Sequence, residues 1–182
     1  MNTGAAVISE YQEYSYKKRI DFILKNYCGI EEYIKGYEEI LCDSIMVDRL
    51  VDRRDGYGDI GVRVQTSYTG DSTAMTAVER STILEKMSEK ALTRHISEDP
   101  VLNKEAVTLR TMKRDLGFVN RAIRMLPGRD SRELGQLLSH EKTIDAVAEE
   151  KGIQYESAKM HIYRTRLKVK ERALEFMERA CA

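Results

Sequence analysis

Hydrophobic residues recur at steps of three and four along most of the chain, which is the period of an amphipathic α-helix. In the first half this pattern predicts helices at about residues 8–27, 30–51 and 73–96. We expect the first two to pair as an antiparallel hairpin. A long apolar stripe then starts at Asp99-Pro100, a capping residue followed by proline at the first helical position. Gly117 interrupts this stripe, so we expect it to bend or divide the helix.

Residues 52–73 are the only long segment without helical periodicity, and glycines punctuate them. Within this loop Val62, Val64 and Tyr68 could form a short strand. The loop also contains a literal G-x-G-x-x-G at residues 56–61. That motif binds dinucleotides only after a buried strand and at the start of a helix. Charged residues precede it here, so we interpret the match as a coincidence, and the role of the loop stays open.

In about the last 55 residues the pattern changes from long helices to short helices separated by turns. Helices are predicted at about residues 129–139, from Thr143 to Lys151, and from near Tyr155 onward. Thr143 is a plausible N-cap, and Gly152 stands where a chain leaves a helix in the left-handed conformation. One face of the last helix is apolar, with Ala158, Ile162, Thr165 and Val169. Its other faces are basic, and such a helix after a glycine turn is typical of a helix-turn-helix, whose second helix enters the major groove.

Charge is divided unevenly between the two parts of the chain. The 30 Lys/Arg and 30 Asp/Glu residues cancel overall. Residues 1–109 nevertheless carry 14 basic and 19 acidic side chains, whereas residues 110–182 carry 16 and 11. Such asymmetry indicates that the basic C-terminal part binds a polyanion and that the acidic N-terminal part has another role. A solvated basic helix would, however, give the same excess of basic residues.

Several function classes are disfavoured by the residues present. Cys28, Cys42 and Cys181 form no CxxC pair, and the three histidines lie far from them, so neither a metal site nor a cofactor is expected. No Ser-His-Asp, Cys-His or paired-carboxylate arrangement stands out, so we expect no enzymatic activity. No apolar run approaches the ~20 residues of a membrane helix, and the start lacks a secretion signal. We therefore expect a cytoplasmic, all-α protein.

The segment LPGRDSRELGQLLSHEKTIDAVAEEKGIQYESAKMHIYRTRLKV resembles region 4 of the sigma-70 family, without a gap over about 45 of the 182 residues. It departs from the family pattern at Lys151, Gln154 and Ala158. No aromatic-rich region 2 is found upstream, so a complete sigma factor is not expected. The overall order resembles phage and prophage late-operon transcriptional regulators of Gram-positive bacteria. The resemblance implies a helical region over residues 1–125 and a helix-turn-helix domain over residues 126–182.

The resemblance also implies which side chains meet DNA. The base-contacting positions at the start of the recognition helix fall on Tyr155, Glu156, Lys159 and Met160. Glu156 could accept from cytosine N4, and Lys159 could donate to guanine O6 and N7. The expected contacts with the DNA backbone are Lys142, Thr143, Tyr163, Arg164, Arg166, Lys168 and Lys170. The implied partners are double-stranded DNA and bacterial RNA polymerase.

Two hypotheses for the function of the whole chain remain. The first is a sequence-specific transcription regulator, and the second is a DNA-packaging or interaction subunit like a small terminase. Small terminases usually place the DNA-binding helices before the oligomerisation helices, and the order here is reversed, which favours regulation. For the acidic first part we expect self-association, or docking on polymerase, through about residues 8–51 and an apolar face that includes Ile34.

Overall fold

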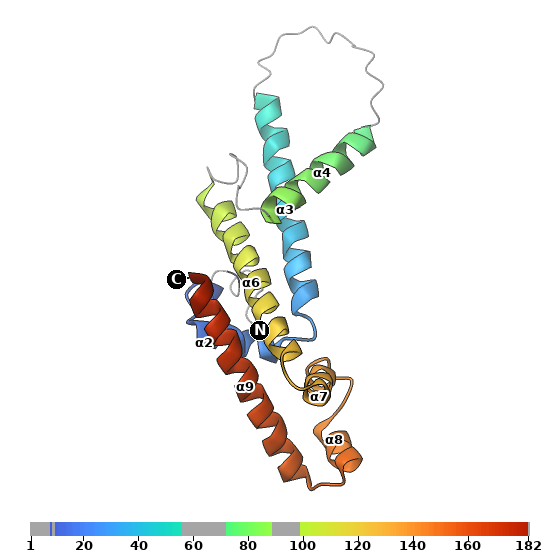
Figure 1. The fold of residues 1–182 in the computed structure, drawn as a ribbon. Helices are drawn as coiled ribbons and strands as arrows, with labels where there is room; N and C mark the ends of the chain where they lie inside the picture. Colours follow the sequence, from blue (N-terminus) through green and yellow to red (C-terminus); the bar gives the residue numbers. More distant parts are fainter. Residues whose placement is uncertain (1–7, 9, 56–71, 89–98, 182) are drawn as a thin grey trace. The chain divides into compact units, whose positions relative to one another are not determined.

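The computed structural model describes residues 8, 10–55, 72–88 and 99–181, and in these ranges every regular element is a helix (Figure 1). The helices are α2 (Tyr16–Lys25), α3 (Ile30–Asp55), α4 (Ser72–Ser88), α6 (Pro100–Arg124), α7 (Gly128–Leu138), α8 (Ile144–Lys151) and α9 (Tyr155–Cys181). The all-α expectation is therefore confirmed. The suggested strand at residues 62–68 and the glycine motif at residues 56–61 lie outside the described residues.

The chain forms two compact units. One unit contains residues 1–34 together with residues 111–182, and the other contains residues 35–110. The helices α3 and α6 each contribute to both units. This grouping differs from the sequence-based division at residues 125 and 126, because α2 belongs with the C-terminal helices. Every residue expected to contact DNA lies in the first unit.

Within the first unit, α2 packs against α9, and the apolar side chains Ile20, Ile23 and Leu24 of α2 are buried. Residues 8–27 are not one continuous helix, which differs from the helix expected there. The chain turns at residues 12–14, and the Ser15 side chain then caps α2 by accepting from the Lys18 backbone N–H at 3.4 Å.

A buried polar cluster fixes the segment before α2 to α6. The Tyr11 hydroxyl donates to Asp115 Oδ2 at 3.2 Å, and Arg19 Nη1 lies 3.6 Å from the same oxygen. Desolvation raises the pKa of Asp115, against the opposing effect of the nearby guanidinium groups. Burial also raises the pKa of Tyr11, which is fully enclosed. Ile34, which the expected docking face includes, is buried too.

The second unit is built from residues 35–55 of α3, from α4 and from the start of α6. Leu41, Cys42 and Ile45 of α3 are buried, as is Ile83 of α4. An ion pair joins Arg80 Nη1 to Asp43 Oδ1 at 3.0 Å. Helix α3 continues four residues beyond the expected end at residue 51, so residues 52–55 are helical and not part of the loop.

Helix α6 begins where the sequence predicts, but it lacks the division expected at Gly117. Asp99 Oδ1 accepts from the backbone N–H groups of Val101 at 2.7 Å and Leu102 at 3.1 Å, which confirms the expected N-cap. Gly117 was expected to bend or divide the helix. It does not divide it, because α6 runs without a break to Arg124. A single glycine only lowers helix propensity, and the buried residues on both sides keep the helix intact.

Candidate nucleic-acid interface

Helices α8 and α9 are joined by a short turn whose geometry follows from its residues. Thr143 Oγ1 accepts from the Ala146 backbone N–H at 3.3 Å and caps the start of α8. Gly152 ends α8 with a φ of 62°, in the left-handed region that favours glycine. The Ile153 backbone N–H donates to the Ala148 carbonyl at 3.0 Å and closes the turn. Both predicted signals, the Thr143 cap and the Gly152 turn, are confirmed.

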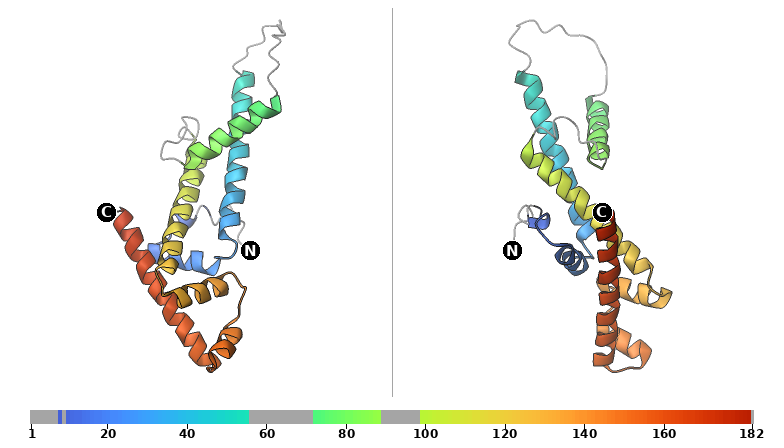
Figure 2. Two further views of the ribbon diagram at one scale, coloured as in Figure 1. Left: turned by 45° about the vertical axis from the view of Figure 1, so that its right-hand side comes forward. Right: turned by 60° about the vertical axis from the view of Figure 1, so that its left-hand side comes forward.

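A small apolar cluster holds the three C-terminal helices together. It consists of Leu137 from α7, Val147 and Ala148 from α8, and Ala158 and Ile162 from α9, with the partly buried Ile144 packed against it. The views in Figure 2 show α8 beside the first turns of α9. Because these turns of α9 are fixed by their buried side, their opposite side has a defined orientation.

The buried face of α9 is the one that the sequence predicted. Ala158, Ile162, Thr165 and Val169 are all buried, with exposures of 5% or less. The Thr165 hydroxyl donates to the His161 carbonyl at 2.9 Å, so its polar atom is satisfied within the helix. This prediction is confirmed.

An ionic cluster beside the apolar one was not expected. Lys151 Nζ lies 2.7 Å from Glu133 Oε2, and the Glu133 side chain is only 9% exposed. His161 Nε2 lies 3.6 Å from Asp130 Oδ1 and 3.8 Å from Glu133 Oε1. The Lys151 side chain therefore extends its ammonium group from the end of α8 to a carboxylate of α7. The only signal in the sequence was an acid among the apolar positions of α7.

The four residues expected to contact bases lie at the start of α9 and are exposed. Lys159 Nζ is 3.6 Å from Glu156 Oε1 and 5.9 Å from the centre of the Tyr155 ring. Met160 is 47% exposed, although it is a large apolar side chain. Since the Glu156 and Lys159 side chains are 74% and 55% exposed, their pairing is weak, and either group can exchange it for another partner.

The residues expected to contact the DNA backbone divide into two groups. Tyr163, Arg164, Arg166 and Lys168 are exposed along α9, and Thr143 is exposed while its oxygen caps α8. The other two have partners within the chain. Lys142 pairs with Glu150, and Lys170 pairs with Asp21 of α2. A phosphate would have to compete with these carboxylates, so the first group is the stronger set of candidates.

The described part of the chain offers neither a metal-binding cluster nor a membrane-spanning helix. It contains no group of three or more His, Cys, Asp or Glu side chains arranged to hold a metal ion. Nor does any helix there combine the length and the apolar character needed to cross a membrane.

Comparison with known proteins assigns neither a family nor a function to the chain. The chain matches no protein-family model, no curated protein and no solved structure. The residues and geometry of α7, α8 and α9 are therefore the basis for a functional proposal.

Proposed function

We propose that the protein is a sequence-specific DNA-binding transcription regulator that acts with RNA polymerase. The observation that carries the proposal is the first half of α9. Its apolar side is fixed by α7 and α8, and its other side presents exposed polar, aromatic and basic residues. An α-helix held in this way by a supporting helix and a glycine turn is the arrangement by which helix-turn-helix proteins read the major groove.

The dimensions of the helix suit this role. An α-helix with its side chains is about 10–12 Å across, which fits a major groove about 12 Å wide. Glu156 and Lys159 are three residues apart and share a face, so both can reach base edges. The exposed Met160 can contact thymine methyl groups, which is the usual apolar contribution to base reading.

The basic residues farther along α9 suit phosphate contact. Arg164 and Arg166 differ by about 200° around the helix axis, so they lie on opposite flanks of α9. A helix inserted in a groove has a phosphate chain on each side, and both flanks then carry a guanidinium group. Arg164 and Lys168 are four apart and form one flank. These contacts would supply affinity without sequence information.

The link to RNA polymerase rests on the resemblance of residues 126–169 to sigma-70 region 4, a domain of promoter recognition. The acidic excess of residues 1–109 supports a division of labour, because a surface rich in carboxylates repels phosphate and is better suited to protein contact.

Selection from a random duplex library with the full chain tests this proposal. We expect enrichment of one sequence pattern and tighter binding to a selected duplex than to a scrambled duplex of equal composition. Affinity for both should fall with salt, with a log–log slope of roughly −0.9 for each phosphate contacted. Recovery of no pattern, with equal affinity for both duplexes, would show that the protein does not read sequence.

A further inference from the structure

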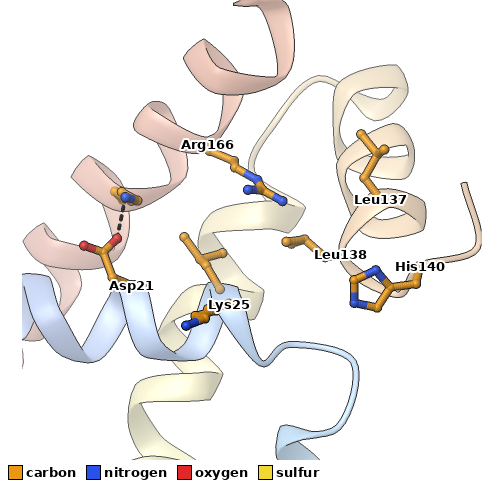
Figure 3. A pocket seen from close by; sticks show the side chains of 8 residues that line it. Asp21, Lys25, Leu137, Leu138, His140 and Arg166 are labelled. Atoms are coloured by element: carbon orange, nitrogen blue, oxygen red, sulfur yellow. Dashed lines mark ion pairs between the residues drawn. The ribbon is translucent and has the colours of Figure 1, made fainter. Parts of the chain in front are cut away.

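A cavity of about 250 Å³ lies where α2, α7 and α9 meet (Figure 3). Its apolar wall consists of the buried side chains Leu24, Leu137 and Leu138. Its polar lining consists of Asp21 and Lys25 from α2, His140 after α7, and Arg166 and Lys170 from α9. The exposed Lys25, His140 and Arg166 leave it open to solvent.

The charges around this cavity do not balance. It has three cationic side chains and one carboxylate, and the carboxylate of Asp21 pairs with Lys170. For Lys25 and Arg166 the described residues supply no carboxylate partner within ion-pair distance. Two cations that face the same cavity without such a partner attract an anion more strongly than either cation would alone.

The cavity is continuous with the surface expected to meet DNA. Lys159, Arg166 and Lys170 are separated by seven and four residues, so they lie along one stripe of α9. Arg166 is about 16 Å along the axis from Tyr155, three turns into α9. Where the first turns of α9 contact base edges, this later part of the helix would face the phosphate chain.

From these observations we infer that the cavity binds a phosphate group, held by Lys25 of α2 and Arg166 of α9. The fork of the arginine matches two phosphate oxygens, and the lysine of α2 adds a point charge. Duplex DNA supplies this group at the edge of the groove, and this part of the inference rests on the proposed function. A free phosphate or a nucleotide has the same chemistry and would occupy the same cavity.

The first experiment examines the cavity without DNA. Inorganic phosphate is titrated into the full chain, and backbone and side-chain NMR signals are followed. We expect shifts confined to the cavity lining, and about fivefold weaker binding in Lys25→Gln, which removes one cation. Lys17→Gln is the matched control, because it removes the same charge from an exposed position of α2 outside the cavity, and it should bind phosphate normally. Phosphate shifts spread evenly over the basic surface would overturn the site.

The second experiment determines the source of the phosphate group. Affinity for duplex DNA is measured at several salt concentrations. If the DNA backbone occupies the cavity, Lys25→Gln flattens the log–log salt slope by about 0.9 and Lys17→Gln leaves it unchanged. A normal slope together with localised phosphate shifts would support a free phosphate ligand and overturn the DNA backbone as its source. A chain that binds no DNA but still shows the localised shifts would contradict the proposed function and leave the cavity supported.

A variant that is expected to bind phosphate more tightly tests whether the weaker binding of Lys25→Gln is due to misfolding. Asp21→Asn removes the one carboxylate of the cavity and releases Lys170, and the Asp21 side chain is 55% exposed, so the fold should tolerate the change. We expect tighter phosphate binding than in the unmodified chain. Unchanged or weaker binding in this variant would overturn the inference.

Discussion

Lys151 shows at the scale of one residue how a departure from a familiar pattern can be accommodated. The resemblance to sigma-type domains leads one to expect an apolar residue there, and a lysine would be expected to weaken the packing. Its ammonium group is instead paired with Glu133 of α7, whose side chain is only 9% exposed. Lys151 and Glu133 are understandable only together, since either one alone would leave a charge in a mostly buried position without this partner.

A double-mutant cycle on this pair is predicted to show strong coupling. Lys151→Leu should lower the free energy of unfolding by about 1–3 kcal/mol, because Glu133 loses its charged partner. The double variant Lys151→Leu/Glu133→Leu should return to within about 1 kcal/mol of the unmodified chain, since apolar residues can replace an enclosed pair. Urea unfolding measures each stability. The exposed pair Glu156–Lys159 is the matched control, with an expected coupling below about 0.5 kcal/mol. Equal coupling in the two pairs would contradict this account of Lys151.

At the scale of elements, local signals proved sufficient for most helix ends in the described residues. Asp99, Thr143 and Gly152 each determine a helix end through their own backbone or side-chain geometry, and all three were predicted from the sequence. The break in the helix expected over residues 8–27 was missed, although Ser15 is a typical N-cap. The apolar periodicity of the flanking residues continued across the break and concealed it.

Two glycines are predicted to respond to alanine with opposite signs. Gly152→Ala should cost about 1 kcal/mol, because an L-residue is disfavoured at its φ of 62° although a Cβ would have open space. Gly117→Ala should stabilise the chain by about 0.5–1 kcal/mol, because that position is helical and a Cβ there meets no neighbour within 4 Å. Urea unfolding of both variants measures the difference. Stabilisation by Gly152→Ala would contradict the left-handed turn between α8 and α9.

At the scale of the whole molecule, the sequence predicted the class of fold but not its grouping. The pairing of α2 with α9, and the contact of Tyr11 with Asp115 more than one hundred residues later, depend on side chains distant in the sequence. Periodicity reports which face of a helix is apolar, but not which other helix covers it. The same limit applied to the candidate site. The exposed face of α9 was predicted, whereas the pairing of Lys170 with Asp21 and the cavity beside Arg166 were not.

This grouping changes how the DNA-binding part should be studied. A fragment of residues 126–182 lacks α2, and it lacks Phe118 and Arg121 of α6, which lie beside the Phe176 ring of α9. Val169, Ala173 and Met177 are buried in the full chain. The second half of α9 would then lose part of its packing, so binding experiments should use the full chain.

The most direct test of the central claim compares Lys159→Ala with Arg164→Ala on a selected and a scrambled duplex, each at several salt concentrations. Both residues are exposed on α9, and both substitutions remove one positive charge. If α9 reads bases, Lys159→Ala costs about 1–3 kcal/mol on the selected duplex only and relaxes the preference at one base pair. Arg164→Ala weakens both duplexes alike and flattens the salt slope by about 0.9. Equal losses on both duplexes for Lys159→Ala would contradict base reading by this lysine and reduce it to a phosphate contact.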